Sequence, residues 1–255
     1  MILNRFANAI REQNWFTVVL EIVVVVVGIF IGLQVDDWNQ DRLEKKIGVQ
    51  YLENIRIAVN ADISMLDELH NRVNGRRSAA EAVLAAVQSG EYDDPGLFIR
   101  QVDRAGWFTT PIYQRAAYED MVATGRSRLI DATLRSQLHE YYRQQLLYDV
   151  GAELQERRVF EGYLPIAVNA LPLESQRWIY DIFEEDMAPL EGPAFLAEEA
   201  AEALANLRAS PDATAGLKGV IRGTWSQERN TRAVRELAIE MKSKLDAAID
   251  APGPQ

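Results

Sequence analysis

The sequence predicts an all-α protein in which an N-terminal transmembrane helix continues into an elongated up-and-down helical bundle. Two observations support this fold class. Residues 15–35 form a nearly continuous apolar run, and apolar residues then recur at three- and four-residue steps along most of the 255-residue chain. No segment shows the alternation of a half-buried strand. We therefore expect a short flank at 1–14, a transmembrane helix at 15–35, a helical soluble domain at 36–250 and a disordered tail at 251–255.

The apolar run has the length of a membrane span. Between Trp15 and Val35 the only strongly polar residues are Glu21 and Gln34. Twenty-one helical residues cover roughly 31 Å, which matches the hydrocarbon core of a bilayer. A buried strand would be far shorter, and a cleavable signal peptide would have a shorter apolar core followed by a small-x-small site. We expect an uncleaved anchor that contacts the lipid bilayer.

One face of this predicted span carries a possible packing motif. Gly28 and Gly32 form a Gly-xxx-Gly pair, and Glu21 lies on the same helical face. This arrangement allows close approach of two helices in lipid, with a carboxyl group at the interface, so it predicts a homo-oligomer. The alternative remains open that the glycine spacing arose by chance and that Glu21 reaches the headgroups.

Orientation follows from flank size more than from charge. Two basic residues precede the span and three closely follow it, so the positive-inside rule does not decide. The short flank and the acidic body favour a cytoplasmic N-terminus and a periplasmic body, in a bacterial inner membrane.

The composition of the body limits its partners. The chain has a net charge of −11, and residues 1–35 contribute nothing to it. An acidic domain is repelled by nucleic acid, so we expect no nucleic-acid partner. The chain has no cysteine, which excludes disulfides, zinc-thiolate sites and thiol nucleophiles.

Helix boundaries within the body follow from periodicity and capping residues. A long helix is predicted from Trp38 to a break at Asn74 and Gly75, and a shorter one from a capping box at Ser78 to Gly90. The apolar face of the long helix comprises Ile47, Tyr51, Ile55, Ala58, Ile63, Leu66, Leu69 and Val73.

Further helices are predicted from Pro111 onward, among them an alanine-rich one over Ala194 to Leu207. Pro111 suits the first turn of a helix that runs to Gly125, Asp131 caps a second long helix, and Ser210 and Pro211 open a third. The predicted buried residues are Leu134, Leu138, Tyr141, Tyr142, Leu146 and Val150 in the second long helix, and Val220, Ile221, Trp225, Val234, Leu237, Met241 and Leu245 in the third.

Two blocks of sequence resemble a known family. The first comprises Glu21-Ile22 and the valines after it, Gly28-Ile29, Ile31-Gly32, Gln34-Val35 and Asp36-Asp37-Trp38-Asn39; the second comprises Thr110-Pro111, Tyr113, Thr124-Gly125, Leu129-Ile130, Leu134, Leu138 and Tyr141-Tyr142. Together they resemble the domain-of-unknown-function 6090 family of bacterial single-span proteins. Leu20 stands where that family tends to have glycine, and Asp36-Asp37 where it tends to have two asparagines. The resemblance implies a membrane anchor and a helical body, and it implies no activity.

Candidate site residues are few. Arg115, Arg126 and Arg128 flank a predicted turn and could hold an anion, although Asp120 and Asp131 are close enough in sequence to pair with them.

No motif indicates a metal or a cofactor. His70 and His139 lack the spacing of a metal pair, and the acid run 184–186 lacks the spacing of a calcium loop. Catalytic motifs are absent as well, so we expect no cofactor, no metal and no enzyme activity.

The sequence therefore favours a membrane-anchored interaction or scaffolding protein of the bacterial cell envelope, with an unknown envelope protein as its partner. Two alternatives remain. One is a ligand-binding or sensory ectodomain with a site between its helices, and the other is an enzyme on a helical-bundle scaffold.

Overall fold

The computed structural model of the chain describes residues 15–182 and 192–250, and every regular element within them is helical. The predicted all-α fold class is confirmed. The expected tail at 251–255, the flank at 1–14 and the acid run at 184–186 lie outside the described residues.

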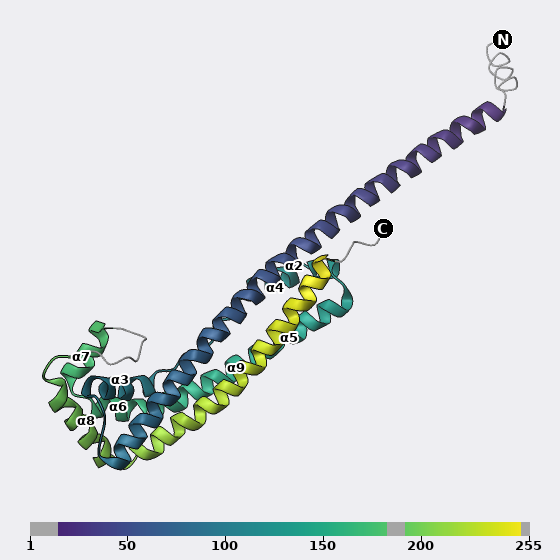
Figure 1. Cartoon of the computed structure of the whole chain (residues 1–255). Coiled ribbons are helices and arrows are strands. Elements are labelled where there is room, and N and C mark those ends of the chain that lie inside the picture. The colour runs from purple at the N-terminus through teal and green to yellow at the C-terminus, as the bar shows by residue number, and fades with distance from the viewer. Residues whose placement is uncertain (1–14, 183–191, 251–255) are drawn as a thin grey trace, which may run out of the picture.

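Helix α2 (Trp15–Ser89) dominates the molecule (Figure 1). Its 75 residues correspond to a length of about 112 Å. The N-terminal part is long and apolar enough to cross a membrane, and none of that apolar window is buried within the chain. Within α2 from residue 19 on, residue 48 is the first buried one, so the same helix extends beyond the apolar part before it joins the body.

The predicted break at Asn74 and Gly75 is wrong, because α2 continues through it and Ser78 lies inside the helix. Val73 and Ala80 are buried on either side of the glycine, so an unbroken helix keeps both in the core. Gly75 also faces α3, where a Cβ atom would lie 3.3 Å from Nη2 of Arg104. The helix ends before Gly90, whose φ of 84° suits glycine.

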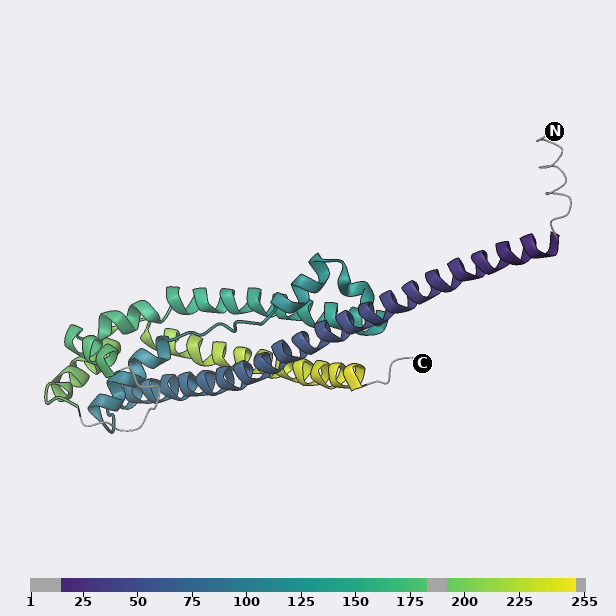
Figure 2. The same ribbon diagram turned by 90° about the horizontal axis from the view of Figure 1, so that it is seen from above.

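Two other long helices pack with α2 to form the body. Helix α9 (Ala213–Asp250) lies along α2, and α5 (Ala132–Glu161) lies beside α9 (Figure 2). The side chain of Asp131 accepts hydrogen bonds from the backbone N–H groups of Thr133 and Leu134, at 2.8 and 3.0 Å, so its predicted capping role is confirmed.

Helices α2 and α5 run in the same direction, so the chain between them has to pass back along the body. An extended stretch makes this connection. Residues 107–115, called the return segment below, pass back along α2. Phe108 stacks with Arg76 near the start of the segment, and Gln114 donates a backbone hydrogen bond to Asp62 near its end. The helix predicted from Pro111 to Gly125 therefore begins only at Ala116, and its predicted start at Pro111 is wrong.

Short helices cover the two ends of the body. At the end nearer the apolar segment lie α4 (Ala116–Ala123) and the 3₁₀ helix η1 (Arg126–Leu129). Gly48 of α2 allows η1 to approach closely, because a Cβ atom there would lie 2.9 Å from the carbonyl oxygen of Leu129. At the far end lie α3 (Pro95–Gly106), α6 (Leu164–Ala170), α7 (Leu173–Ile182) and α8 (Leu196–Ala209).

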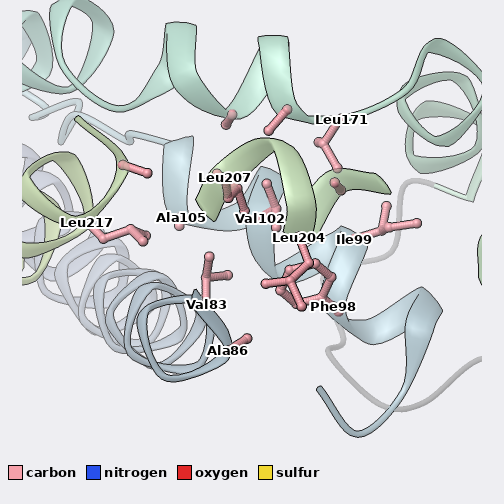
Figure 3. Close-up of a cluster of buried hydrophobic side chains, with 14 of the residues drawn as sticks. Val83, Ala86, Phe98, Ile99, Val102, Ala105, Leu171, Leu204, Leu207 and Leu217 are labelled. Atoms are coloured by element: carbon pink, nitrogen blue, oxygen red, sulfur yellow. The ribbon is translucent and has the colours of Figure 1, made fainter. Parts of the chain in front are cut away.

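The core has two main parts. The far core joins α2 to the short helices and is rich in small aliphatic side chains, including Val83, Ala105 and Leu207 (Figure 3). The near core contains aromatic residues, including Tyr141 and Tyr142 of α5. A smaller cluster in the middle of the body comprises Leu66, Leu69, Val73 and Val234.

Three predicted core residues are wrong. Trp225 of α9 is 58% exposed, and Leu146 and Val150 of α5 are 54% and 58% exposed. The described helices cover the neighbouring faces of α5 and α9 at these positions, where Gln145 and Thr224 are fully buried. The apolar periodicity predicts which side chains share a helix face, but it does not predict along what length another helix buries that face.

Candidate functional site

The candidate packing residues of the apolar segment lie on an open helix surface. A Cβ atom added at Gly28 or Gly32 would meet nothing within 4 Å. Glu21 is exposed on the same helix. The row is therefore free to contact a second helix, and the oligomer stays a prediction.

The three candidate arginines have separate surroundings. Arg126 donates a 2.8 Å hydrogen bond from Nη1 to the hydroxyl of Tyr51, and Arg128 forms a 3.0 Å ion pair with Glu44 of α2. Arg115 instead turns toward α5. The structure therefore does not bring the three guanidinium groups together as a single anion site.

Arg115 belongs to a buried polar network around Asp62. Asp62 is fully buried and accepts three hydrogen bonds: from the backbone N–H of Gln114 at 2.8 Å, from Nε2 of Gln145 at 2.8 Å and from the hydroxyl of Tyr141 at 3.1 Å. Burial raises the pKa of the Asp62 carboxyl, while these hydrogen bonds and the charge of Arg115 oppose the rise.

Arg115 extends this network to the surface of α5. Its Nη2 atom lies 2.5 Å from Oδ2 of Asp149 in an ion pair, and its guanidinium stacks on the ring of Tyr113. The hydrogen bonds around Asp62 thus join α2, the return segment and α5. This arrangement is typical of a network that fixes a fold, because its buried carboxylate is satisfied.

A second buried charge lies further along α2, at the bottom of a groove. The groove has a volume of about 920 Å³ and runs between α9 on one side and α5 and α6 on the other. Gly219 and Gly223 leave part of the wall formed by α9 without side chains, and Val159 and Ile166 supply apolar surface opposite. Arg76, which is 4% exposed, lines the groove from α2. We call this the arginine groove.

Arg76 has no anionic partner among the residues that the structure describes. Its Nε atom is buried without a hydrogen bond. Among the described residues, its guanidinium forms a cation–π contact with Phe108, with Cζ 5.1 Å from the ring centroid, and no ion pair. Burial alone lowers the pKa of Arg76 to about 10, so the group still carries its charge at neutral pH.

A buried acceptor lies close to Arg76. The Oε1 atom of Gln155 has no hydrogen-bond partner. A Cβ atom at Gly223 would lie 3.9 Å from this oxygen and 3.9 Å from Nη2 of Arg76. The arginine groove therefore presents a donor group and an acceptor to the same space beside α9.

The charged rim of the groove is balanced. Arg158 and Arg222 lie on it, and so do Glu161 and Asp212, all four of them exposed. The uncompensated charge is therefore inside the groove rather than around its mouth.

The outer face of α5 carries an exposed apolar row. Its members are between 53% and 58% exposed. They are Leu146, Leu147, Val150 and Leu154. Helical spacing of three, four and eight residues places them on one side of α5, and we call them the α5 row.

Residues 15–182 and 192–250 contain no candidate metal site, since no group of three or more histidine and acidic side chains converges there. Nδ1 of His139 lies 3.2 Å from the hydroxyl of Tyr118, and Nε2 of His70 lies 2.9 Å from Nδ2 of Asn74.

No family model, no curated protein and no solved structure matches the chain. Membership of the domain-of-unknown-function 6090 family therefore stays a prediction from the two sequence blocks.

Proposed function

We propose that this protein is a single-span protein of the bacterial inner membrane whose periplasmic helical body binds another protein of the cell envelope. The observation that carries this proposal is the α5 row. Four large aliphatic side chains exposed together on one helix face form a surface that water solvates poorly, and such surfaces are typical of protein interfaces.

The shape of the α5 row favours an amphipathic helix as the occupant. Leu146, Val150 and Leu154 follow one another at four-residue steps, so the row is narrow and straight. A partner helix with apolar residues at the same spacing would cover it by ordinary ridge-and-groove packing.

The experiment that tests the interaction is site-specific photocrosslinking in cells. A photoreactive residue at Val150 should yield an adduct of higher mass, and the same residue at Arg229, which is exposed on α9, should not. An adduct with twice the mass of the chain would identify a second copy as the occupant. The proposal is contradicted if Val150 and Arg229 give the same products.

The orientation of the chain in the membrane determines whether the body can meet a periplasmic partner, and it can be tested separately. We infer a cytoplasmic N-terminus because the body that follows the apolar segment is acidic. Fusion of alkaline phosphatase to the C-terminus should then give active enzyme, and fusion of a fluorescent protein that matures only in the cytoplasm should stay dark. The reverse result would place the body in the cytoplasm.

Self-association through the apolar segment is a further part of the proposal. The open surface at Gly28 and Gly32 supports it. Replacing both glycines with leucine should abolish self-association in membranes, because the larger side chains keep two backbones apart. Unchanged self-association would exclude this interface.

A second candidate function is that of a ligand-binding ectodomain. The observation that favours it is the arginine groove, whose volume lies in the range of small-molecule sites.

A further inference from the structure

We infer that the arginine groove binds a small organic anion, with an acidic group of the ligand on Arg76 and an apolar part along α5 and α6. This inference rests on the second candidate function, and it does not depend on a partner at the α5 row. The ligand class is a carboxylate or phosphate monoester that carries an aryl or alkyl group.

The charge of Arg76 requires a counterion that the described part of the chain does not supply. A guanidinium removed from water is unfavourable unless an anion and hydrogen bonds compensate it. Asp62, on the same helix, has three hydrogen bonds, whereas Nε of Arg76 has none. A bound carboxylate or phosphate would accept two parallel hydrogen bonds from this planar group.

The groove leaves room for such a ligand beside Arg76. A Cβ atom at Gly219 would meet nothing within 4 Å, and one at Gly223 would come no closer than 3.9 Å to Arg76 or Gln155. The unpartnered Oε1 of Gln155 would accept a hydrogen bond from a hydroxyl or N–H of the ligand. Val159 and Ile166 provide the apolar surface that the remainder of the ligand would cover.

The rim and the position of the groove restrict the ligand further. The balanced rim has no excess of positive charge that would attract a polyanion such as a nucleic acid. Arg76 lies 41 residues beyond Val35 along one continuous helix, which corresponds to about 60 Å. A lipid headgroup of the membrane that holds the apolar segment would not reach it, so the ligand comes from the aqueous phase.

Calorimetric titration of the full chain in detergent tests this inference. The probes are phenylacetate and phenyl phosphate, and their uncharged counterparts are phenylacetamide and phenol. At least one acid should bind saturably, and its uncharged counterpart should bind at least tenfold more weakly. Circular dichroism of each variant below establishes that it folds.

Two variants and one control locate the binding. Arg76→Met removes the charge, and Gly223→Leu fills the groove from α9 while leaving Arg76 in place; each should weaken binding of the acid at least tenfold. Arg157→Met removes an equal charge from the exposed face of α5, outside the groove, and should leave binding unchanged. The inference is overturned if neither acid binds at millimolar concentration, or if all three variants bind as the natural chain does. Crosslinking from Val150 is independent of both results, so failure of the anion site and failure of the protein interface are distinguishable.

Discussion

Two charged side chains are buried on the same helix, and their surroundings differ. Asp62 lies where the return segment and α5 cross α2, and three hydrogen bonds reach its carboxyl group. Arg76 lies four turns further on, beside an open groove, with a ring contact and no ion pair among the described residues. One charge is compensated from within the protein, and the other is accessible to a compensating group from outside.

The difference in surroundings indicates a structural role for Asp62 and agrees with the ligand-binding role inferred for Arg76. Hydrogen bonds to Asp62 hold three segments together, so its removal would leave their donors unsatisfied. Arg76 holds nothing together through hydrogen bonds, and it is costly to the folded state. Substitutions at the two positions should therefore change stability in opposite directions.

The largest effect is expected for Asp62→Ala. It leaves the donors of Gln114, Tyr141 and Gln145 buried without an acceptor, so the free energy of unfolding should fall by about 3 kcal/mol. Urea denaturation followed by circular dichroism measures the change. Asp67→Ala is the control, because Asp67 pairs with Arg235 at the surface and its removal should cost about 1 kcal/mol or less. Similar losses at both positions would remove the basis of the comparison.

Arg76→Met should raise the free energy of unfolding, by about 1 kcal/mol. Methionine fills a similar volume without a buried charge, which outweighs the lost contact with Phe108. The same urea titration without ligand provides the measurement. A loss comparable with that of Asp62→Ala would show that Arg76 is structural after all.

Alanine substitutions at two glycines compare the open groove with a packed contact. Gly219 lies in the groove, and Gly48 packs against η1. Gly219→Ala should stabilise α9 by about 0.5 to 1 kcal/mol, because alanine favours a helix and the added methyl group meets no neighbour. Gly48→Ala should destabilise the chain, since its methyl group would lie 2.9 Å from the carbonyl oxygen of Leu129 and the backbone of η1 would have to move. Thermal unfolding of the two variants should therefore shift in opposite directions, and parallel shifts would contradict the assigned packing.

The smallest effect concerns pH. Burial raises the folded-state pKa of Asp62 above its ordinary value of 3.8, so the folded chain retains this proton at pH values where the unfolded chain has lost it. The resulting stabilisation is full below the unfolded pKa and is lost as pH rises through the folded pKa. Asp62→Asn cannot titrate, so the stability of the natural chain relative to this variant should decline as pH rises above about 4. Parallel stability profiles would indicate that the pKa of Asp62 is not raised.

Much of the fold could be predicted because local signals determine it. The apolar segment, the cap at Asp131 and the helix end at Gly90 each depend on residues close together in the sequence. The return segment could not be predicted in this way. Pro111 is compatible with a helix start, and only contacts with distant residues such as Asp62 and Arg76 hold residues 107–115 extended.

The buried charges could have been found from the sequence with a stricter pattern. Alternate steps of four and three residues along α2 define a single row, and every member of it is buried. The row comprises Ile55, Val59, Asp62, Leu66, Leu69, Val73, Arg76, Ala80 and Val83. Only two members of this row are charged, which marks them as buried charges. Whether each has a partner depends on α5, α9 and the return segment, and the order of residues does not reveal it.

The unbroken course of α2 has a mechanical consequence. From Val35 to Ser89 the helix contains 54 steps without a break, a length of about 81 Å. If the apolar segment tilts by about ten degrees in a bilayer, a rigid helix swings its far end through about 14 Å. A change in membrane thickness or in the packing of two spans would then be amplified as a lever amplifies a small displacement, and the arginine groove lies near the end of that lever.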